Sequence, residues 1–239
     1  MAMGAGMMGQ WLRRQAQAHW ARLAANAAPP ASADLAEARA LRADLERLLR
    51  RAEAQQLRAT RPLPLGCDWA WRPDPWLRRM QPPGLTEPAA GAALAPGVRV
   101  FHDAGRAECT VRQLPGPDFG LALEAYGFDG GFLSLSFDLP PEAVAGLGHT
   151  HVLVVQLALE AERPAQLFCR LNLRHGPNTE QMLRSVAPDT QRAEFDLAYA
   201  AFNDRRLEQG WLDVIVEAPR MTAVVLRDMV LLRHPRADI

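Results

Sequence analysis

The sequence feature that most constrains the fold is an alternation of apolar and polar residues that sets in after Gly97. Apolar residues recur at every second position over short segments, which are separated by Gly, Pro and Asp. A period of two is typical of β-strands that bury one face, because successive side chains point to opposite sides. It predicts nine strands, at residues 98–102, 108–113, 119–126, 132–139, 151–160, 166–174, 193–198, 211–217 and 223–233.

Nine short strands with turn residues between them indicate a sandwich or a barrel. Residues 97–239 are enough to form a core between two layers. The remaining segments of this region, 140–147 and 199–209, are expected to be short helical excursions. The fold class that follows is mainly β, an antiparallel β-sandwich.

Residues 1–61 have a different composition, dominated by Ala, Leu, Arg, Glu and Gln, which all favour helices. One helix is predicted at 11–25, and a second begins after Pro29 and Pro30, where Asp34 and Glu37 form a capping box. The second helix carries an apolar stripe, formed by Ala38, Leu41, Leu45, Leu48, Leu49 and Ala52. We therefore expect an α-helical hairpin before the sandwich. It is basic, with ten Arg and five acidic residues.

Residues 62–96 join the two parts and contain eight prolines together with Trp69, Trp71 and Trp76. Such a density of proline excludes a helix or a central strand. We expect an extended wrap or linker whose tryptophans fill apolar notches of the sandwich. An exposed aromatic platform for a sugar ring is the alternative.

The composition excludes several classes of chemistry. All 27 basic residues are Arg, so neither a Schiff-base lysine nor the lysine of a P-loop is present. A net charge of zero argues against specific nucleic-acid binding. Three distant cysteines lack the close pairs of a zinc site, and for His149 and His151 no third metal ligand can be named. We expect no metal and no cofactor.

The sequence also bears on localisation. No signal peptide and no transmembrane segment is predicted. We therefore expect a cytoplasmic protein, with peripheral membrane contact left open.

The strand predicted at 166–174 is the most informative for function. Its apolar residues Leu167, Cys169, Leu171 and Leu173 alternate with an outward row that contains Arg170, Asn172 and Arg174. A polar turn from His175 to Gln181 follows. Guanidinium and amide groups at fixed spacing favour recognition of anionic or hydroxylated ligands. The candidate ligand-binding residues are Arg170, Asn172, Arg174, His175, Asn178, Tyr199 and Asn203. The alternative is a solvated outer face with a structural turn.

A second polar cluster surrounds Asp213, whose expected role is to neutralise Arg205, Arg206 or Arg227. Pairing of Asp213 with Asp196 or Glu180 across strands is left open. No nucleophile motif is present, so no catalytic residue is assigned. An enzyme in which His175 is a base assisted by Glu180 or Asp196 stays open as an alternative.

Several segments carry a resemblance to a known family. They are residues 66–73 (GCDWAWRP), 170–181 (RLNLRHGPNTEQ), 195–199 (FDLAY), 211–217 (WLDVIVE) and 225–228 (VLRD). Together they resemble an uncharacterised bacterial family, a domain of unknown function, from which no activity can be transferred. The pair 211–217 and 223–233 also looks like the final hairpin of carbohydrate-binding jelly rolls, which implies a jelly-roll-like sandwich.

The function expected from the residues is a non-catalytic binding module that recognises a polysaccharide or another anionic or hydroxylated ligand. The alternative is a structural adaptor, whose basic helices in residues 1–61 dock on a partner protein or an anionic membrane surface. Three parts are predicted: residues 1–61 as the helical hairpin, 62–96 as the wrap or linker, and 97–239 as the sandwich.

Overall fold

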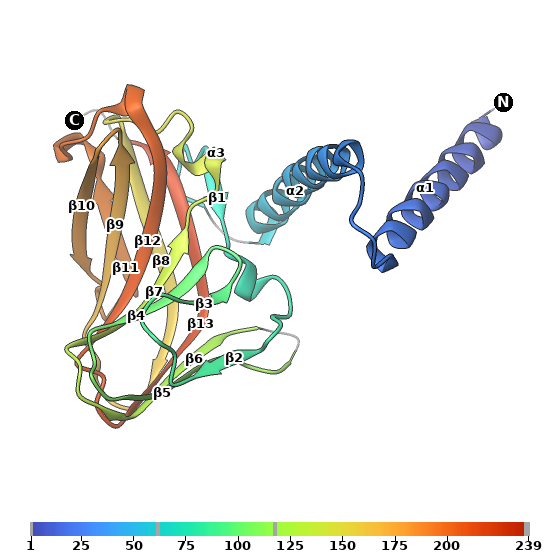
Figure 1. Cartoon of the computed structure of the whole chain (residues 1–239). Coiled ribbons are helices and arrows are strands. Elements are labelled where there is room, and N and C mark those ends of the chain that lie inside the picture. Colours follow the sequence, from blue (N-terminus) through green and yellow to red (C-terminus); the bar gives the residue numbers. More distant parts are fainter. Residues whose placement is uncertain (1, 61–62, 117–118, 237–239) are drawn as a thin grey trace. The chain divides into compact units, whose positions relative to one another are not determined.

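The structure is a computed structural model that describes residues 2–60, 63–116 and 119–236 (Figure 1). The chain divides into two compact units, residues 1–51 and 52–239. Each unit is described by itself.

The first unit contains α1 (Ala2–Ala25) and most of α2 (Ser32–Thr60). The prediction that Asp34 caps α2 is wrong, because the helix begins at Ser32 and the amide of Leu35 already donates to the carbonyl of Ala31 at 3.1 Å. Asp34 instead lies in the first turn, where its carboxylate interacts favourably with the helix dipole. In the part of the chain that the structure describes, no helix has the length and apolarity to cross a membrane.

The second unit is built on two antiparallel sheets. In the order of pairing, the seven-stranded sheet contains β11 (Arg192–Asp196), β8 (His151–Ala161), β13 (Thr222–Pro235), β6 (Leu121–Phe128), β5 (Ala107–Gln113) and β2 (Gly84–Thr86), with β1 (Trp69–Trp71) also paired to β13. The six-stranded sheet contains β10 (Asn178–Ser185), β9 (Leu167–His175), β12 (Leu207–Glu217), β7 (Phe132–Asp138), β4 (Val98–His102) and β3 (Ala92–Ala95). The predicted class, an antiparallel β-sandwich preceded by helices, is confirmed.

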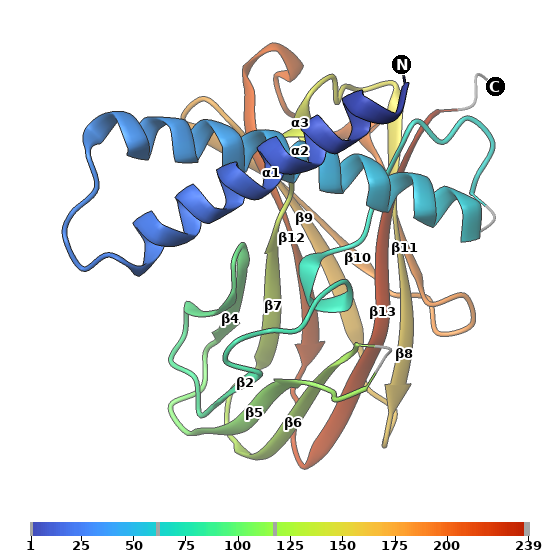
Figure 2. The same ribbon diagram turned by 90° about the vertical axis from the view of Figure 1, so that its right-hand side faces the viewer.

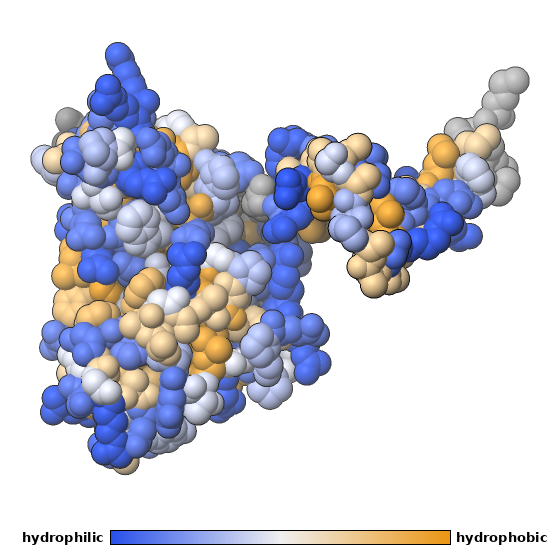
Figure 3. All heavy atoms as spheres, in the orientation of Figure 1, coloured by the Kyte–Doolittle hydropathy of each residue, from blue (hydrophilic) through white to orange (hydrophobic). Residues whose placement is uncertain are grey.

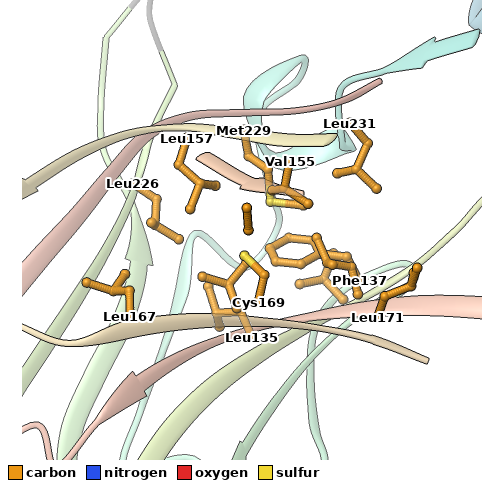
Figure 4. Close-up of a cluster of buried hydrophobic side chains, with 14 of the residues drawn as sticks. Leu135, Phe137, Val155, Leu157, Leu167, Cys169, Leu171, Leu226, Met229 and Leu231 are labelled. Atoms are coloured by element: carbon orange, nitrogen blue, oxygen red, sulfur yellow. The ribbon is translucent and has the colours of Figure 1, made fainter. Parts of the chain in front are cut away.

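The main core lies between the two sheets, where the alternation predicts it. Figure 4 shows apolar side chains of both sheets facing one another, among them Leu135, Cys169 and Leu171 on one side and Val155 and Met229 on the other. The four inward residues expected on β9 are all buried. The long strands β8 and β13 run side by side in the seven-stranded sheet (Figure 2).

All nine predicted strands are present, but the turn expected from His175 to Gln181 is mostly a strand. Gly176, with a φ of +59°, makes the turn, and β10 starts at Asn178. The other short elements are α3 (Pro141–Val144) and the 3-10 helices η1 (Asp74–Trp76), η2 (Leu197–Tyr199) and η3 (Asp204–Arg206).

The expected hairpin between residues 211–217 and 223–233 is not formed. Strands β12 and β13 belong to different sheets, so the segment between them crosses from one layer to the other. Two residues of this connection, Ala218 and Met221, have positive φ angles of 40° and 47°. Period-two alternation is the same for a hairpin and for such a crossing, which is why the sequence did not separate them.

The proline-rich segment adds short strands to the sheets. Strands β2 and β3 lie at sheet edges, where proline is tolerated. Trp76 is 2% exposed, its indole nitrogen donates to the carbonyl of Leu226 at 3.1 Å, and its ring lies 5.7 Å from that of Phe137. Trp69 and Trp71 stack at 6.3 Å and pack against the core. The tryptophans therefore fill the sandwich, as expected, rather than form an exposed platform.

A second, smaller core covers the outer face of the seven-stranded sheet. Leu57, near the end of α2, is buried there with Ala70 of β1, Val152 and Val154 of β8, and Val230 and Leu232 of β13. The last turns of α2 are thus part of the second unit. A truncation that keeps the sandwich intact must therefore end near Arg51 and spare Leu57.

The three cysteines test the position of the main core. Cys109 and Cys169 are buried, whereas Cys67 is partly exposed. Burial, reinforced by the carboxylate of Asp213, raises the pKa of Cys169 to about 12, and burial together with Glu87 also raises the pKa of Cys109.

Since the thiolate is the reactive form, we expect DTNB at pH 8 to modify Cys67 alone in the folded protein and all three thiols in guanidinium chloride. Rapid modification of two or three thiols without denaturant would contradict this core.

Candidate functional site

The outer face of the six-stranded sheet carries a band of polar side chains. On β9, the alternation that buries Leu171 and Leu173 places Arg170, Asn172 and Arg174 on the opposite side. The expected Arg-Asn-Arg row is therefore present. It continues onto neighbouring strands, because residues paired across strands share a face.

Two rows of paired residues cross this face. One row contains Leu183, Arg170, Asp213, Ser136 and Arg99, in the order β10, β9, β12, β7, β4. The next row contains Gln181, Asn172, Trp211 and Asp138. Charged, amide and aromatic groups thus lie side by side on a rigid sheet.

A hollow of about 380 Å³ lies over these rows, and we refer to it as the sheet groove. Its lining residues come from β4, β7, β9, β10 and β12 and are Arg99, Phe101, Ser136, Asp138, Arg170, Asn172, Arg174, Gln181, Gln209, Trp211 and Asp213. Concave surfaces with a few convergent polar groups are the usual form of a small-molecule or glycan site.

The carboxylate of Asp213 organises the floor of the sheet groove. Its Oδ2 atom accepts a hydrogen bond of 2.9 Å from Nε of Arg170 and another of 2.9 Å from Nδ2 of Asn172. Asp213 is 3% exposed and Asn172 is fully buried. A buried carboxylate needs such partners, because loss of hydration is costly.

The expected partners of Asp213 are therefore wrong. Its charge is balanced by Arg170 and not by Arg205, Arg206 or Arg227, and Arg227 pairs instead with Glu160 at 2.8 Å. The reason is the strand order. Asp213 lies directly opposite Arg170 in the register of β12 and β9, and sequence alternation does not reveal which strands are neighbours.

This arrangement leaves several polar atoms without a protein partner. Arg170 uses Nε for Asp213, and no hydrogen bond from either of its Nη atoms occurs among the described residues. Nδ2 of Asn172 also donates to the carbonyl of Arg170 at 3.1 Å, whereas its Oδ1 atom is buried and accepts no hydrogen bond from any residue of the described part. Fixed, unsatisfied polar atoms in a hollow are suited to a polar ligand.

The structure brings together only part of the predicted ligand set. Arg170, Asn172 and Arg174 line the sheet groove, and Arg174 is half exposed, with Glu208 at 3.5 Å. His175 and Asn178 face each other at the end of the β9–β10 hairpin.

The last two predicted residues lie away from the groove. The amide of Asn203 donates to Nδ1 of His175 at 3.4 Å, and the side chain of Asn203 caps η3 by accepting from the amide of Arg205. Tyr199 is 81% exposed in η2, and its hydroxyl accepts from Arg236 at 3.2 Å. None of His175, Asn178, Tyr199 and Asn203 lines the sheet groove.

The arrangement expected for an enzyme is not formed in the described part of the chain. Glu180 accepts from the amide of Ala201, Asp196 pairs with Arg236 at 3.1 Å, and no hydrogen bond joins either of them to His175.

His149 is likewise used by the fold. Both of its ring nitrogens lie near carbonyl oxygens, those of Leu197 and Phe202, and its ring stacks on Phe202. Within residues 2–60, 63–116 and 119–236, no cluster of three metal-ligating side chains occurs.

Eight groove residues lie outside the predicted ligand set. They are Arg99, Phe101, Ser136, Asp138, Gln181, Gln209, Trp211 and Asp213. On β4 and β7, alternation alone marks Arg99, Phe101, Ser136 and Asp138 as outward positions. The missing information was the pairing of β12 with both β9 and β7, which joins three separate polar rows into one surface.

Fold and site define a β-sandwich protein with a polar groove on one sheet and a basic helical segment before it. The model of a family of unknown function, DUF6478, matches residues 1–239, and the chain belongs to this family. The expected membership in an uncharacterised family is thus confirmed. No curated protein matches the chain in sequence.

Several solved structures are similar to the sandwich. The enzymatically active domain of tailspike protein 4 from Bacteriophage CBA120 matches with a TM-score of 0.40 and 5% identity, over 57% of this chain and 19% of that one. A C-terminal family 22 carbohydrate-binding module from Clostridium thermocellum matches with a TM-score of 0.36 and 10% identity, over 75% and 99% of the two chains. A family 11 module from the same organism, in complex with a β-1,3-1,4-mixed-linked tetrasaccharide, has a TM-score of 0.36 and 13% identity, over 65% and 96%. The expected likeness to carbohydrate-binding sandwiches is found, but at these scores it carries no information on the ligand.

The buried carboxylate can be tested by its contribution to stability. Asp213→Ala leaves Arg170 Nε and Asn172 Nδ2 without their acceptor. Because Asn172 is fully buried, water cannot replace that acceptor for its amide. We expect the free energy of unfolding to fall by about 2 kcal/mol, less than for a fully buried pair because Arg170 is partly exposed. Urea unfolding measures this change. Glu160→Ala, which removes an exposed partner of Arg227, is the control and should leave the urea midpoint nearly unchanged. Equal effects of both variants would contradict the organising role of Asp213.

Proposed function

We propose that the protein is a non-catalytic binding module that holds a glycan or a related hydroxyl-rich ligand in the sheet groove. The observation that carries this proposal is the Asp213 cluster in the floor of a concave face. It orients Arg170, whose Nη atoms have no acceptor among the described residues, and it holds the buried Asn172, whose Oδ1 atom has no donor there. Hydroxyl groups both donate and accept hydrogen bonds, so they match a surface that mixes guanidinium, amide and carboxylate groups.

Two aromatic side chains complete the sheet groove. Trp211 of β12 is partly exposed in the row of Asn172, and Phe101 of β4 is 38% exposed two strands away. The apolar faces of sugar rings stack on such side chains, while their hydroxyls reach the polar groups nearby. Because the groove is open and its polar groups lie on strands, the site is preorganised, and we expect modest affinity with little rearrangement.

Trp211 provides the test of this function. We expect Trp211→Ala to weaken binding of a groove ligand about tenfold, because the variant loses the stacking surface and its buried area. Oligosaccharides of several backbones are screened by thermal shift, and those that bind are titrated by NMR. Tyr199→Ala is the matched control, since Tyr199 is an exposed aromatic residue outside the groove. Loss of binding in the Tyr199 variant, with none in the Trp211 variant, would move the site away from the groove.

A second candidate function concerns the helical hairpin. An apolar hollow of about 370 Å³ lies between α1 and α2, lined by residues such as Trp20, Leu23, Leu41 and Leu45. Leu45 and Leu48 are 50% and 61% exposed, and Figure 3 shows apolar surface on both helices. Residues 1–51 contain eight Arg and four acidic residues. A concave apolar surface on a segment with an excess of Arg fits an acidic amphipathic helix of a partner protein, which would make the protein an adaptor.

Full-length variants test the adaptor function. A labelled 21-residue helical peptide with Leu at every third or fourth position and Glu elsewhere should bind the wild type, and Leu45→Glu should weaken binding at least tenfold. Ala43→Glu, on an exposed position outside the hollow, is the control. The same peptide with Lys in place of Glu should not bind. Binding to phosphatidylserine vesicles without binding to the acidic peptide would overturn this candidate in favour of a membrane surface.

A further inference from the structure

We propose that the ligand of the sheet groove is an acidic sugar, whose ring carboxylate binds the guanidinium of Arg170. This inference rests on the proposed function and makes it more specific. The groove lining contains three guanidinium groups, those of Arg99, Arg170 and Arg174, and two carboxylates, those of Asp138 and Asp213. The arrangement of these charges, rather than their number, indicates the class of ligand.

Arg170 presents an available fork of donors. Its Nε–H is fixed on the buried Asp213, which orients the guanidinium plane, while its Nη groups have no acceptor among the described residues and its side chain is 39% exposed. A guanidinium binds a planar carboxylate through two parallel hydrogen bonds. Because Asp213 already holds the plane, little side-chain entropy is lost when a carboxylate binds.

The charge of Asp213 is balanced by Arg170, which lies beside it on the neighbouring strand. Only 4% of the Asp213 side chain is exposed, so the exposed charged groups of this row are Arg170 and, at the end on β4, Arg99. Arg99 is exposed and forms no ion pair with any described residue. With Asp213 paired to Arg170, the row keeps one net positive charge, that of Arg99.

The row of Asn172 and Asp138 favours hydroxyl groups in the same ligand. The Oδ1 atom of Asn172 can only accept a hydrogen bond, and it is buried without a donor. Asp138, in the same row, is also an acceptor. Arg170 and Asn172 are two positions apart on β9, which places their Cα atoms about 7 Å apart, comparable to a pyranose ring with its substituents. One uronic acid ring carries both the carboxylate for Arg170 and hydroxyls for the polar groups of the neighbouring row, Gln181 and Asp138 among them.

The same groups disfavour sulfated or phosphorylated chains. Sulfation or phosphorylation replaces hydroxyl groups, which donate hydrogen bonds, by groups that accept them, whereas the carboxylate of Asp138, in the row next to Arg170, needs a donor. A chain with one carboxylate and free hydroxyls on each ring fits the groove better.

The test compares matched sugars on the full-length protein. Tetramers of galacturonate, glucuronate and mannuronate, their neutral hexose counterparts and a sulfated tetramer are titrated by calorimetry at 20 mM and 150 mM NaCl. We expect at least one uronate to bind tenfold or more tightly than its neutral counterpart, with the difference shrinking at high salt. Arg170→Gln should lower uronate affinity tenfold or more, and the preference for the uronate over its neutral counterpart should disappear.

Two further variants keep the test independent of the fold of the Arg170 variant. Arg99→Gln, at an exposed position of the groove, should lower uronate affinity about threefold, and Arg192→Gln, an exposed position on the other sheet, should leave it unchanged. If neutral and acidic tetramers bind equally, or the sulfated tetramer binds best, the inference is overturned and the proposed function stands. If no sugar binds, both are overturned.

Discussion

The carboxylate of Asp213 is the group around which the functional face of the sandwich is arranged. It accepts 2.9 Å hydrogen bonds from β9, through Arg170 and Asn172, while it belongs to β12 itself. Without these two partners, a carboxylate that is only 3% exposed would strongly destabilise the folded protein. Paired in this way, it fixes a guanidinium and an amide in a single orientation. A surface that would otherwise be a set of mobile polar side chains thereby becomes a preorganised site.

The polar face and the apolar core are two consequences of the same alternation. Leu171 and Leu173 can lie between the sheets only if Asn172 and Arg174 lie outside, since a shift of one residue would exchange the two sets. Burial of the core residues of β9, β12 and β7 therefore fixes the register that places Arg170 opposite Asp213. The stability of the hydrophobic core and the geometry of the site are therefore coupled, although no residue of that core lines the sheet groove.

The sequence was sufficient for nine of the thirteen strands in the described part of the chain and for three of the eleven groove residues, and physical reasons explain the remainder. Period-two alternation located β4 and the apolar row of β9, because burial of one face is a local property of each strand. Strand order depends on long-range pairing, so the partner of Asp213 and the contribution of Arg99 were not predicted. A polar strand at a sheet edge, β10, has no apolar alternation over its first residues and was taken for a turn. Tyr199 was included as an aromatic residue close to the polar cluster in sequence. The sequence does not show which face of the fold such a residue occupies.

The most direct test of this account is the state of the Arg170 Nε–H and of the Asn172 side-chain amide in the ligand-free protein. Both can be observed by ¹⁵N NMR, with assignment by the Arg170→Gln and Asn172→Ala variants. We predict a slowly exchanging Arg170 Nε–H and slowly exchanging Asn172 amide protons, since both groups are held by Asp213. An Arg170 Nε–H that exchanges with water as fast as that of Arg99, together with rapidly exchanging Asn172 amide protons, would contradict this prediction.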